Sequence, residues 1–436
     1  MLTKVEQHIN KNLPFLTDKK LLVACSGGLD SMVLANLLKQ LNFDISIAHC
    51  NFNLRGEESN GDENFIADYA GKNNIPIFIT HFDTALFAAD NKLSIQVAAR
   101  QLRYIWFHQV LEQNNLDYVL TAHHLDDSLE TFLINFTRGT GVEGLTGIPQ
   151  QNDKVVRPLL PFTRSEIVAY AKENSIAWRE DSSNASDKYL RNKLRHDVVP
   201  ILKSLNPSFM ESFADTLLHL QQAQSMVSDA SGLVYKQVVT ENEGQKRINI
   251  SELKRLPNYR AYLYQWLSPY GFTAWDDIYA LSDSQSGKQV LTPHFRLLKD
   301  REALILEPVK ESDTQGYEIQ EGQEEMNIPL KLRLTNVDKV FKTSESNVVY
   351  LDAQKLKFPL FVRKWQEGDN FYPLGMNGQK KKVSKYFKDE KFSLSEKEDA
   401  WLLCSENDIA WIIGKRADHR FKIETTTTQI LKIEVL

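Results

Sequence analysis

Six consecutive residues near the N-terminus have the composition of an anion-binding turn. They are Ser26, Gly27, Gly28, Leu29, Asp30 and Ser31, between an apolar run that ends at Cys25 and another that begins at Met32. The first run predicts a buried strand and the second a helix. The glycines let the backbone approach an anion closely, and the helix N-terminus offers N–H groups to phosphate oxygens. The sequence has no GxxxxGK[ST] motif, so a lysine-tipped phosphate loop is excluded. A turn that only opens a helix is the alternative interpretation.

A second cluster follows the apolar run 117–122. His124, Asp126, Asp127 and Glu130 stand at the start of a predicted helix, where Asp127 and Glu130 share one face because they are three residues apart. Helix capping is the alternative for either aspartate, since the dipole favours carboxylates at a helix N-terminus. Capping does not account for the four residues together.

Two arginines form the third cluster. Arg191 and Arg195 lie in the segment YLRNKLR and are four residues apart, so one helix face would carry both guanidinium groups. Guanidinium groups suit phosphate oxygens or a carboxylate. A solvated basic helix face is the alternative.

Strand-like and helix-like stretches alternate between residues 19 and 205, which predicts an α/β fold with a doubly wound parallel sheet. Ligands of such sheets bind at the carboxyl ends of the strands, where Ser26, His49 and His124 fall. The predicted strands are 21–25, 45–50, 76–80 and 117–122, and the predicted helices are 31–41, 61–73, 94–113, 126–137 and 163–174.

The character of the chain changes near residue 206. A helical pattern follows, then a hairpin-like stretch at 295–306 and a polar, acidic segment at 310–325 that is typical of a linker. Short alternating apolar runs come after it. We therefore predict a phosphate-binding catalytic domain at 1–205, a helical middle domain at 206–312 and a small strand-rich domain at 313–436, with its core at about 356–436.

The composition is that of a soluble globular protein, with 42% apolar and 25% charged residues among 436. No apolar run approaches the ~18 residues of a membrane span, and the polar N-terminus does not resemble a signal peptide. Three scattered cysteines, Cys25, Cys50 and Cys404, predict reduced thiols and a cytoplasmic protein.

The net charge of −5 argues against indiscriminate nucleic-acid binding but permits a local basic face. The densest basic cluster stands beside Tyr386 and Phe387, and Arg363 extends it. Its lysines are Lys380, Lys381, Lys382 and Lys385. A solvated edge beside core aromatics is the alternative.

The loop at 26–31 matches the SGGxDS signature of PP-loop enzymes, and the N-terminal half resembles the tRNA(Ile)-lysidine synthetase family. The C-terminal domain resembles that family too, around Gly368-Asp369 and the lysine cluster. Further landmarks in the family's order are Leu54-Arg55, Arg103-Tyr104, HHLDDSLET at 123–131, RGTGVEGL at 138–145, RPLL at 157–160, DSSN at 181–184 and YLRNKLR at 189–195.

This resemblance implies an ATP-dependent reaction on a tRNA. The family joins L-lysine to the wobble cytidine of a tRNA(Ile) with a CAU anticodon. The cytosine 2-oxygen attacks the α-phosphate of ATP, pyrophosphate leaves, and the lysine amine then displaces AMP. ATP with Mg²⁺, L-lysine and the tRNA are the implied cofactors and partners, with no membrane. A homodimer is compatible with the sequence.

The resemblance also implies roles for the residues. The loop at 26–31 would hold pyrophosphate, with Mg²⁺ at Asp30. Asp127 and Glu130 would hold the ammonium groups of lysine, and Asp127 is the candidate acceptor of the amine's proton. The remaining implied contacts are His49, His124 and Asp126 in the nucleotide pocket, Arg191 or Arg195 on the adenylate phosphate or the lysine carboxylate, Arg103 on the target cytidine or a phosphate, and Arg363 with the lysine cluster on tRNA.

Two departures from the family pattern affect the second strand's end. Phe52 stands where the family often has a second histidine, and Asn53 replaces a glycine. Asparagine tolerates the left-handed conformation, so the turn is preserved, whereas the hydrogen-bonding role of that histidine is lost. In the C-terminal domain, Lys397 replaces a common arginine and Trp401 a common proline.

Three other functions compete with this one. A sulfur-inserting PP-loop tRNA enzyme would usually need paired cysteines, and the sequence has no CxxC motif. A small-molecule amide-forming synthetase would leave the lysine-rich C-terminal domain without a purpose. A catalytically inactive RNA-binding module would not need the acidic and arginine clusters together.

Overall fold

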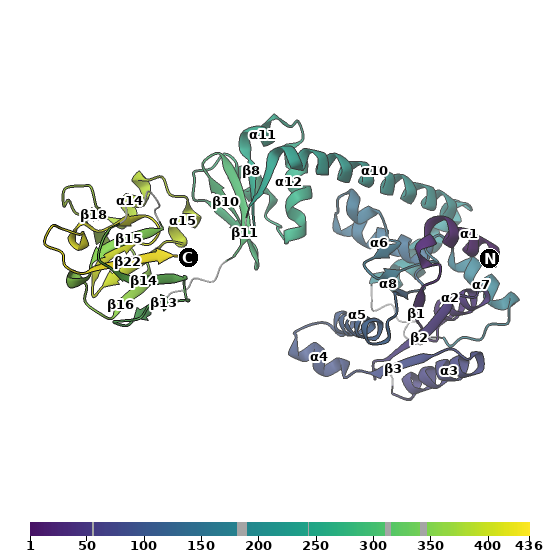
Figure 1. The fold of residues 1–436 in the computed structure, drawn as a ribbon. Coiled ribbons are helices and arrows are strands. Elements are labelled where there is room, and N and C mark those ends of the chain that lie inside the picture. The colour runs from purple at the N-terminus through teal and green to yellow at the C-terminus, as the bar shows by residue number, and fades with distance from the viewer. Residues whose placement is uncertain (55, 181–189, 243, 310–314, 341–346) are drawn as a thin grey trace. The chain divides into compact units, whose positions relative to one another are not determined.

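The computed structural model describes residues 1–54, 56–180, 190–242, 244–309, 315–340 and 347–436. The chain divides into two compact units, Met1–Asp229 and Ala230–Leu436, each of which is described by itself (Figure 1). Arg55, the DSSN motif, Tyr189 and the first part of the predicted linker, 310–314, lie outside the described residues. The boundaries of the three predicted domains stay a prediction.

A mostly parallel sheet forms the centre of the first unit, as the sequence predicted. β1 pairs in parallel with β2 and β4. The sequence did not predict the last two strands: β6 pairs in parallel with β4, and β5 adds an antiparallel edge. The four predicted strands agree with β1 to β4 within two residues at each end. In the described residues the strand order is β3-β2-β1-β4-β6-β5, with bounds β1 (Lys20–Ala24), β2 (Asp44–Asn51), β3 (Ile77–His81), β4 (Tyr118–Leu120), β5 (Gln151–Asn152) and β6 (Val155–Val156).

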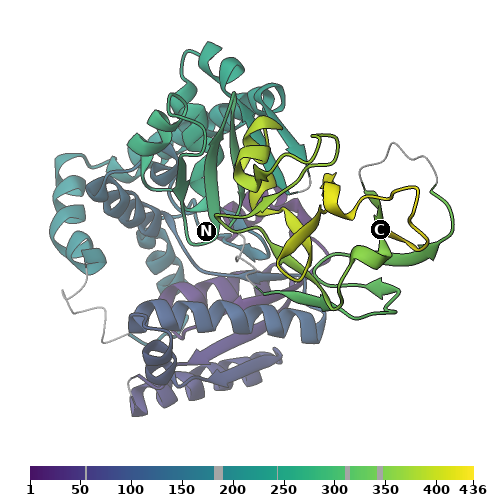
Figure 2. The same cartoon turned by 90° about the vertical axis from the view of Figure 1, so that its left-hand side faces the viewer.

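Helices cover both faces of this sheet (Figures 1 and 2). Successive strand residues point to opposite faces: Leu21 and Val23 of β1 pack in the core with α1, α2, α3 and α7, whereas Leu22 packs with Phe107 and Leu111 of α5. The five predicted helices are confirmed as α2, α3, α5, α6 and α7. The helices of this unit are α1 (Leu2–Asn12), α2 (Leu29–Gln40), α3 (Glu57–Asn73), α4 (Thr84–Asp90), α5 (Ile95–Asn114), α6 (Leu125–Arg138), α7 (Arg164–Glu173), α8 (Leu190–Lys193), the π-helical turn η4 (Leu194–Val198) and α9 (Val199–Leu205).

The long helix α10 (Phe209–Val238) confirms the helical pattern predicted after residue 206. Phe213 and Leu217 on its first half pack against Leu125 and Leu129 of α6. These contacts fix α6, which carries the acidic cluster, from the side opposite the sheet loops. Within the described ranges, neither α10 nor any other helix combines the length and apolar character needed to cross a membrane.

The first part of the second unit contains more strand than the sequence predicted. The predicted hairpin at 295–306 is present as β10 (Phe295–Asp300) and β11 (Ala303–Pro308), but it lies inside a larger antiparallel sheet. The additional strands β7 (Val239–Asn242), β8 (Gln245–Asn249) and β9 (Gln289–Leu291) are short and bury few of their side chains, so their sequences lack a clear apolar alternation. The accompanying helices are α11 (Ile250–Arg255), α12 (Tyr259–Leu267) and α13 (Trp275–Leu281).

The C-terminal part of this unit is rich in strands, as predicted. Two antiparallel sheets share a core that includes Leu351, Leu403, Trp411 and Ile433. One sheet contains β12 (Tyr317–Ile319), β16 (Leu360–Lys364), β19 (Trp401–Ser405), β20 (Asp408–Ile412) and β21 (Arg416–Ala417), and the other β13 (Glu325–Met326), β14 (Leu332–Val337), β15 (Val348–Asp352) and β22 (Ile430–Val435). β17 (Asn370–Phe371) pairs with β18 (Lys381–Lys382), and α14 (Val383–Asp389) and α15 (Leu394–Glu398) follow.

Candidate active site

The loop between β1 and α2 is closed by its own serines. Ser31 Oγ accepts a hydrogen bond from the backbone N–H of Ser26 at 3.2 Å and donates one to the carbonyl of Gly28 at 2.9 Å. Gly27 has a φ of 83°, and a Cβ on it would come within 3.4 Å of Ile66. A side chain at Gly27 would therefore be strained. The loop is held as a tight turn that presents the N-terminus of α2 at the carboxyl edge of the sheet, which is the geometry expected for a phosphate site.

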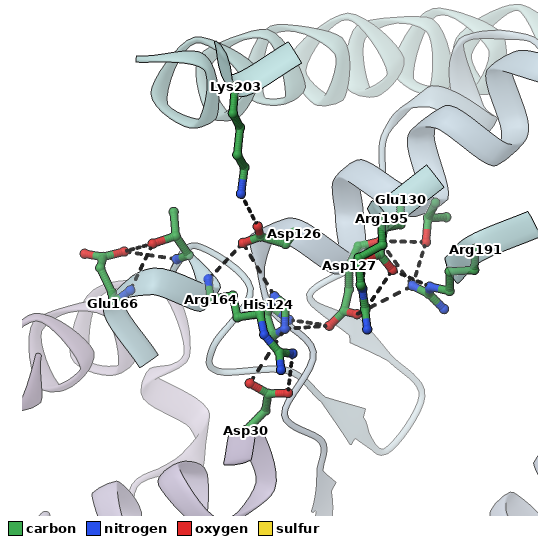
Figure 3. Close-up of polar contacts among 12 residues, drawn as sticks. Asp30, His124, Asp126, Asp127, Glu130, Arg164, Glu166, Arg191, Arg195 and Lys203 are labelled. Atoms are coloured by element: carbon green, nitrogen blue, oxygen red, sulfur yellow. Dashed lines mark hydrogen bonds and ion pairs between the residues drawn. The ribbon is translucent and has the colours of Figure 1, made fainter. Parts of the chain in front are cut away.

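Asp30, in the first turn of α2, faces the loop that follows β4 (Figure 3). Its Oδ1 lies 3.7 Å from His124 Nε2, and its Oδ2 lies 3.5 Å from Arg164 Nη1. Burial raises the pKa of Asp30 against the opposing effect of these two neighbours. Oδ1 is buried and has no hydrogen-bond partner among the described residues. A buried carboxylate oxygen without a donor is one that a bound cation can satisfy.

Asp127 is a second carboxylate with the opposite electrostatic character. Its Oδ2 accepts a hydrogen bond from the backbone N–H of His124 at 3.0 Å and lies 3.5 Å from the Nε2 of that residue. Burial alone would raise the pKa of Asp127, but His124, His123 and Arg191 lower it overall. Asp127 is therefore ionised throughout the neutral pH range.

Glu130 is buried between the two predicted arginines. Its side chain is 3% exposed and receives Arg191 Nε at 2.6 Å on Oε2 and Arg195 Nε at 2.5 Å on Oε1. Arg195 Nη2 also lies 3.0 Å from Oε2. The same guanidinium groups reach Asp127 Oδ1 at 3.6 Å from Arg191 and 3.8 Å from Arg195. The carboxylate and guanidinium clusters that the sequence placed on separate helices thus form one network.

Asp126 has a different environment from its neighbours in the acidic cluster. Its Oδ2 accepts the backbone N–H of Arg164 at 2.8 Å, and its Oδ1 pairs with Lys203 Nζ at 2.8 Å. Although burial favours the neutral acid, these hydrogen bonds lower the pKa of Asp126. Asp126 joins α6 to the start of α7 and to α9, and it does not line the cavity described next.

A cavity of about 980 Å³ opens at this edge of the sheet. Its volume is at the upper end of the range usual for ligand sites. The predicted residues that line it are Ser26, Gly28, Leu29, Asp30, Ser31, Arg103, His124, Asp127 and Arg195. The predicted residues Gly27, His49, Asp126, Glu130 and Arg191 are not among its lining residues.

His49 supports the phosphate loop from the adjacent strand. It is buried, and its Nδ1 lies 2.9 Å from the carbonyl oxygen of Cys25, the residue that precedes the loop. Burial lowers the pKa of His49. A neutral imidazole with Nδ1–H donating to Cys25 fits these contacts, so His49 holds the entry of the loop from behind.

Some site residues were missed by the sequence analysis. Arg164 and Lys203 contact the acidic cluster from 38 and 77 residues away, a separation that leaves no local pattern. His123 lines the cavity, and its Nδ1 lies 2.9 Å from Thr121 Oγ1. Burial lowers the pKa of His123 to about 4. The HH pair in HHLDD could have identified His123, but only His124 was assigned a role.

The predicted tRNA-binding residues of the C-terminal part belong to the second unit. Arg363 forms a two-point ion pair with Asp369, with both distances 2.8 Å. Lys381 pairs with Asp389 at 2.8 Å and is only 14% exposed. Lys380, Lys382 and Lys385 are exposed and form no ion pair with any described residue. These three lysines, rather than the whole cluster, present charge to solvent.

Comparison with known proteins gives full-length matches. A family described as PP-loop domain matches residues 1–202, and one described as TilS substrate binding domain matches residues 241–309. The chain is similar to the tRNA(Ile)-lysidine synthase of Bacteroides thetaiotaomicron, with 39% identity over 435 residues and 99% of both chains covered. It is also similar to that of Parabacteroides distasonis (38% over 441 residues, 100% of both) and of Porphyromonas gingivalis (36% over 423 residues, 93% of this chain and 92% of the relative).

Replacing Glu130 by glutamine should destabilise the first unit, because an amide cannot neutralise the two guanidinium groups that converge on it. The expected cost is about 1–3 kcal/mol, which corresponds to a melting temperature lower by roughly 2–12 °C for a unit of this size. Thermal unfolding followed by circular dichroism measures the change. Glu143→Gln, at an exposed position, is the matched control, and equal melting temperatures for the two variants would contradict the buried network.

His123 should remain neutral down to about pH 5, since burial lowers its pKa to about 4. The unfolded chain takes up a proton on this residue near pH 6.5 whereas the folded chain does not, so stability is lost as the pH falls from about 6.5 toward 4. The loss between pH 7 and pH 5 is roughly 2 kcal/mol. His123→Asn should therefore show a smaller fall of melting temperature over that range than the parent. The same fall in both proteins would mean that His123 titrates normally.

Proposed function

The chain belongs to the tRNA(Ile)-lysidine synthase family, and we propose that it joins L-lysine to the wobble cytidine of a tRNA(Ile) with a CAU anticodon, at the expense of ATP. The products are lysidine, AMP and pyrophosphate. The observation that carries this proposal is that one cavity is lined by the phosphate loop at Ser26–Ser31 and by Asp127 and Arg195. A nucleotide and a dipolar amino acid can therefore be bound beside each other.

In the first step, the cytosine 2-oxygen attacks the α-phosphorus of ATP and the bond to the pyrophosphate group breaks. The N-terminus of α2 and the serine hydroxyls of the loop receive the β- and γ-phosphates, where N–H donors and the helix dipole stabilise the departing charge. Asp30 would hold Mg²⁺, whose charge would neutralise phosphate oxygens, because its buried Oδ1 has no hydrogen-bond partner among the described residues. No cluster of three or more metal-binding side chains occurs in the described chain, so phosphate oxygens would complete the coordination.

In the second step, the lysine amine attacks carbon 2 of the adenylated cytidine and AMP leaves. Asp127 is the carboxylate that would hold an ammonium group of lysine, since it lines the cavity and its pKa is lowered. The lowered pKa makes it a poorer acceptor of the amine's proton than the sequence suggested. Glu130 is already neutralised by Arg191 and Arg195, so we assign it to positioning these arginines rather than to lysine.

The arginines would then act on the anionic groups of the intermediate. Arg195 lines the cavity and binds Glu130 through Nε and Nη2, while Arg191 binds it through Nε. The Nη2 atoms of Arg191 and Arg195 lie 3.6 Å and 3.8 Å from Asp127 Oδ1. Guanidinium donors in this position suit the adenylate phosphate or the lysine carboxylate.

Burial raises the pKa of Cys50 to about 12 and also raises that of Cys25, which makes thiolate-based sulfur transfer at this site unfavourable.

The remaining parts of the proposal concern location and partners. The unpaired cysteines agree with a reducing compartment, and we propose a cytoplasmic protein. We also propose that exposed lysines of the second unit contact tRNA phosphates. The homodimer considered from the sequence stays a prediction.

Lysine transfer is the direct test of this function. The protein is incubated with ATP, radiolabelled lysine and unmodified tRNA(Ile) carrying a CAU anticodon, and the tRNA is digested to nucleosides. Label should appear on cytidine, with AMP and pyrophosphate formed in equal amounts. Label incorporated without tRNA, or ATP cleavage without any transfer of lysine, would refute the proposal.

Replacing Asp127 by asparagine should raise the KM for lysine by about 10- to 100-fold, because an amide does not neutralise an ammonium group. Initial rates of lysine transfer at varied lysine concentration measure this change. Asp153→Asn, an exposed acidic residue outside the cavity, is the matched control and should behave as the parent. Transfer by Asp127→Asn at the parental KM would remove Asp127 from the lysine site.

Loss of the exposed lysines should weaken tRNA binding in a salt-dependent way. The triple change Lys380→Ala, Lys382→Ala and Lys385→Ala should reduce the slope of log affinity against log salt by about 2–3, near 0.7–0.9 for each phosphate contact. Filter binding of tRNA at 50–300 mM salt gives the slope. Lys172→Ala, at an exposed position on α7, is the control. An unchanged slope in the triple variant would place the tRNA contact elsewhere.

A further inference from the structure

Phe52 and Arg103 form a cation–π pair on the wall of the cavity. Phe52 directly follows β2, and Arg103 lies on α5; both line the cavity. The guanidinium carbon of Arg103 lies over the Phe52 ring, 5.2 Å from its centroid.

The pair is supported from behind by further aromatic side chains. The Phe82 ring stacks on Phe52 at 5.6 Å with an angle of 27° between the planes, and Trp106 meets Phe82 edge-on at 6.5 Å. The backbone of this turn is fixed as well: Thr84 Oγ1 donates to the Phe52 carbonyl at 3.1 Å, and Asn53 adopts the left-handed φ of 53° expected for it. Phe52 is therefore held in place.

The guanidinium group of Arg103 has no polar partner among the described residues. Among the described residues it forms no side-chain ion pair or hydrogen bond, in contrast to Arg191 and Arg195, which bind Glu130. A guanidinium plane over an aromatic ring keeps its donors and its outer face available. Arg103 is thus a cation held at the cavity wall by a ring rather than by a carboxylate.

We propose that Phe52 is a positioning residue for the target base: it holds Arg103 over its ring so that the guanidinium forms the next layer of the stack, on which the cytosine of the tRNA settles. Single-stranded bases are recognised by stacking on aromatic rings or guanidinium planes, and a base presented for chemistry leaves its own stack and needs such a replacement. The inference rests on the proposed function, since it takes the substrate base to be a tRNA cytosine.

The choice of an aromatic partner has a chemical reason. A carboxylate facing Arg103 would neutralise the guanidinium and use its donors, as Glu130 does for Arg191 and Arg195. The Phe52 ring orients the cation without consuming a donor, so that Arg103 can stack on a base through its face and donate within its plane to a neighbouring phosphate. Phe52 would thus replace the family's histidine by a contact of another kind.

Stacking can be measured apart from catalysis by placing the fluorescent analogue pyrrolocytosine at the wobble position of the tRNA. Its emission should fall on binding to the parent protein and to Phe52→Tyr, which keeps the ring. Phe52→Leu, which keeps much of the volume but no ring, should lose the quench, as should Arg103→Ala. Phe136→Leu changes an exposed aromatic outside the cavity and should behave as the parent. Quenching that survives in Phe52→Leu would overturn the proposal.

Kinetics then test whether Phe52 acts through Arg103. Phe52→Leu should raise the KM for tRNA by about 2- to 30-fold, the range of one cation–π contact, with the KM for ATP unchanged, and Phe52→Tyr should restore it. In an Arg103→Ala background, Phe52→Leu should add little. A rise in the KM for ATP instead, or an undiminished effect in that background, would overturn the assignment.

The two proposals fail separately. The quench is recorded without lysine or ATP, so a parent protein that quenches the base but transfers no lysine retains the stacking role and loses the proposed function. A parent protein that transfers lysine but quenches no base, with pyrrolocytosine tRNA bound to saturation, loses the stacking role alone.

Discussion

The arrangement of the site depends on one buried carboxylate that pairs with two cations. Glu130 receives Arg191 and Arg195 from segments 61 and 65 residues away, and so fixes α8 and η4 against α6. A buried ion pair is weak support for stability in itself, because desolvation offsets much of the attraction, but it determines position well. Both Nε atoms and Arg195 Nη2 bind Glu130, and this pairing brings the Nη2 atoms of Arg191 and Arg195 to 3.6 Å and 3.8 Å from Asp127 Oδ1. The positive wall of the cavity is therefore a consequence of Glu130.

The other two carboxylates of the site differ because their surroundings differ. Asp127 lies among His123, His124 and Arg191, which outweigh its burial and lower its pKa. Asp30 is dominated by burial, which raises its pKa despite His124 and Arg164. Carboxylates whose environments push their pKa values apart are suited to different tasks. Asp127 is suited to an ammonium group that brings one positive charge, whereas the charged form of Asp30 would be stabilised by an additional cation such as the one that accompanies a nucleotide.

Much of this arrangement follows from local sequence, and the rest follows from contacts that no local pattern encodes. The apolar runs predicted β1 and β2 because these strands are buried on both faces, and the strand ends then located Ser26, His49 and His124. The three-residue spacing placed Asp127 and Glu130 on one face but could not show that Glu130 turns to two arginines. Lys203 and the short strands β7 to β9 were missed, since a distant ion pair and a strand with few buried side chains leave no periodic signal.

In the second unit, the number of basic residues in the sequence overestimates the positive charge that is available to a ligand. The sequence groups four lysines with Arg363. However, Arg363 is already paired with Asp369, and Lys381 is paired with Asp389. A cation already paired with a carboxylate displaces few counterions when it meets a phosphate, so its contribution to nucleic-acid affinity is small. Paired cations can instead shape the surface: Arg363 holds the turn at Asp369, whose carboxylate also accepts the backbone N–H of Gln366 at 2.7 Å. Under the proposed function, the exposed lysines would supply the electrostatic attraction to tRNA, while the net charge of −5 opposes indiscriminate binding of nucleic acids.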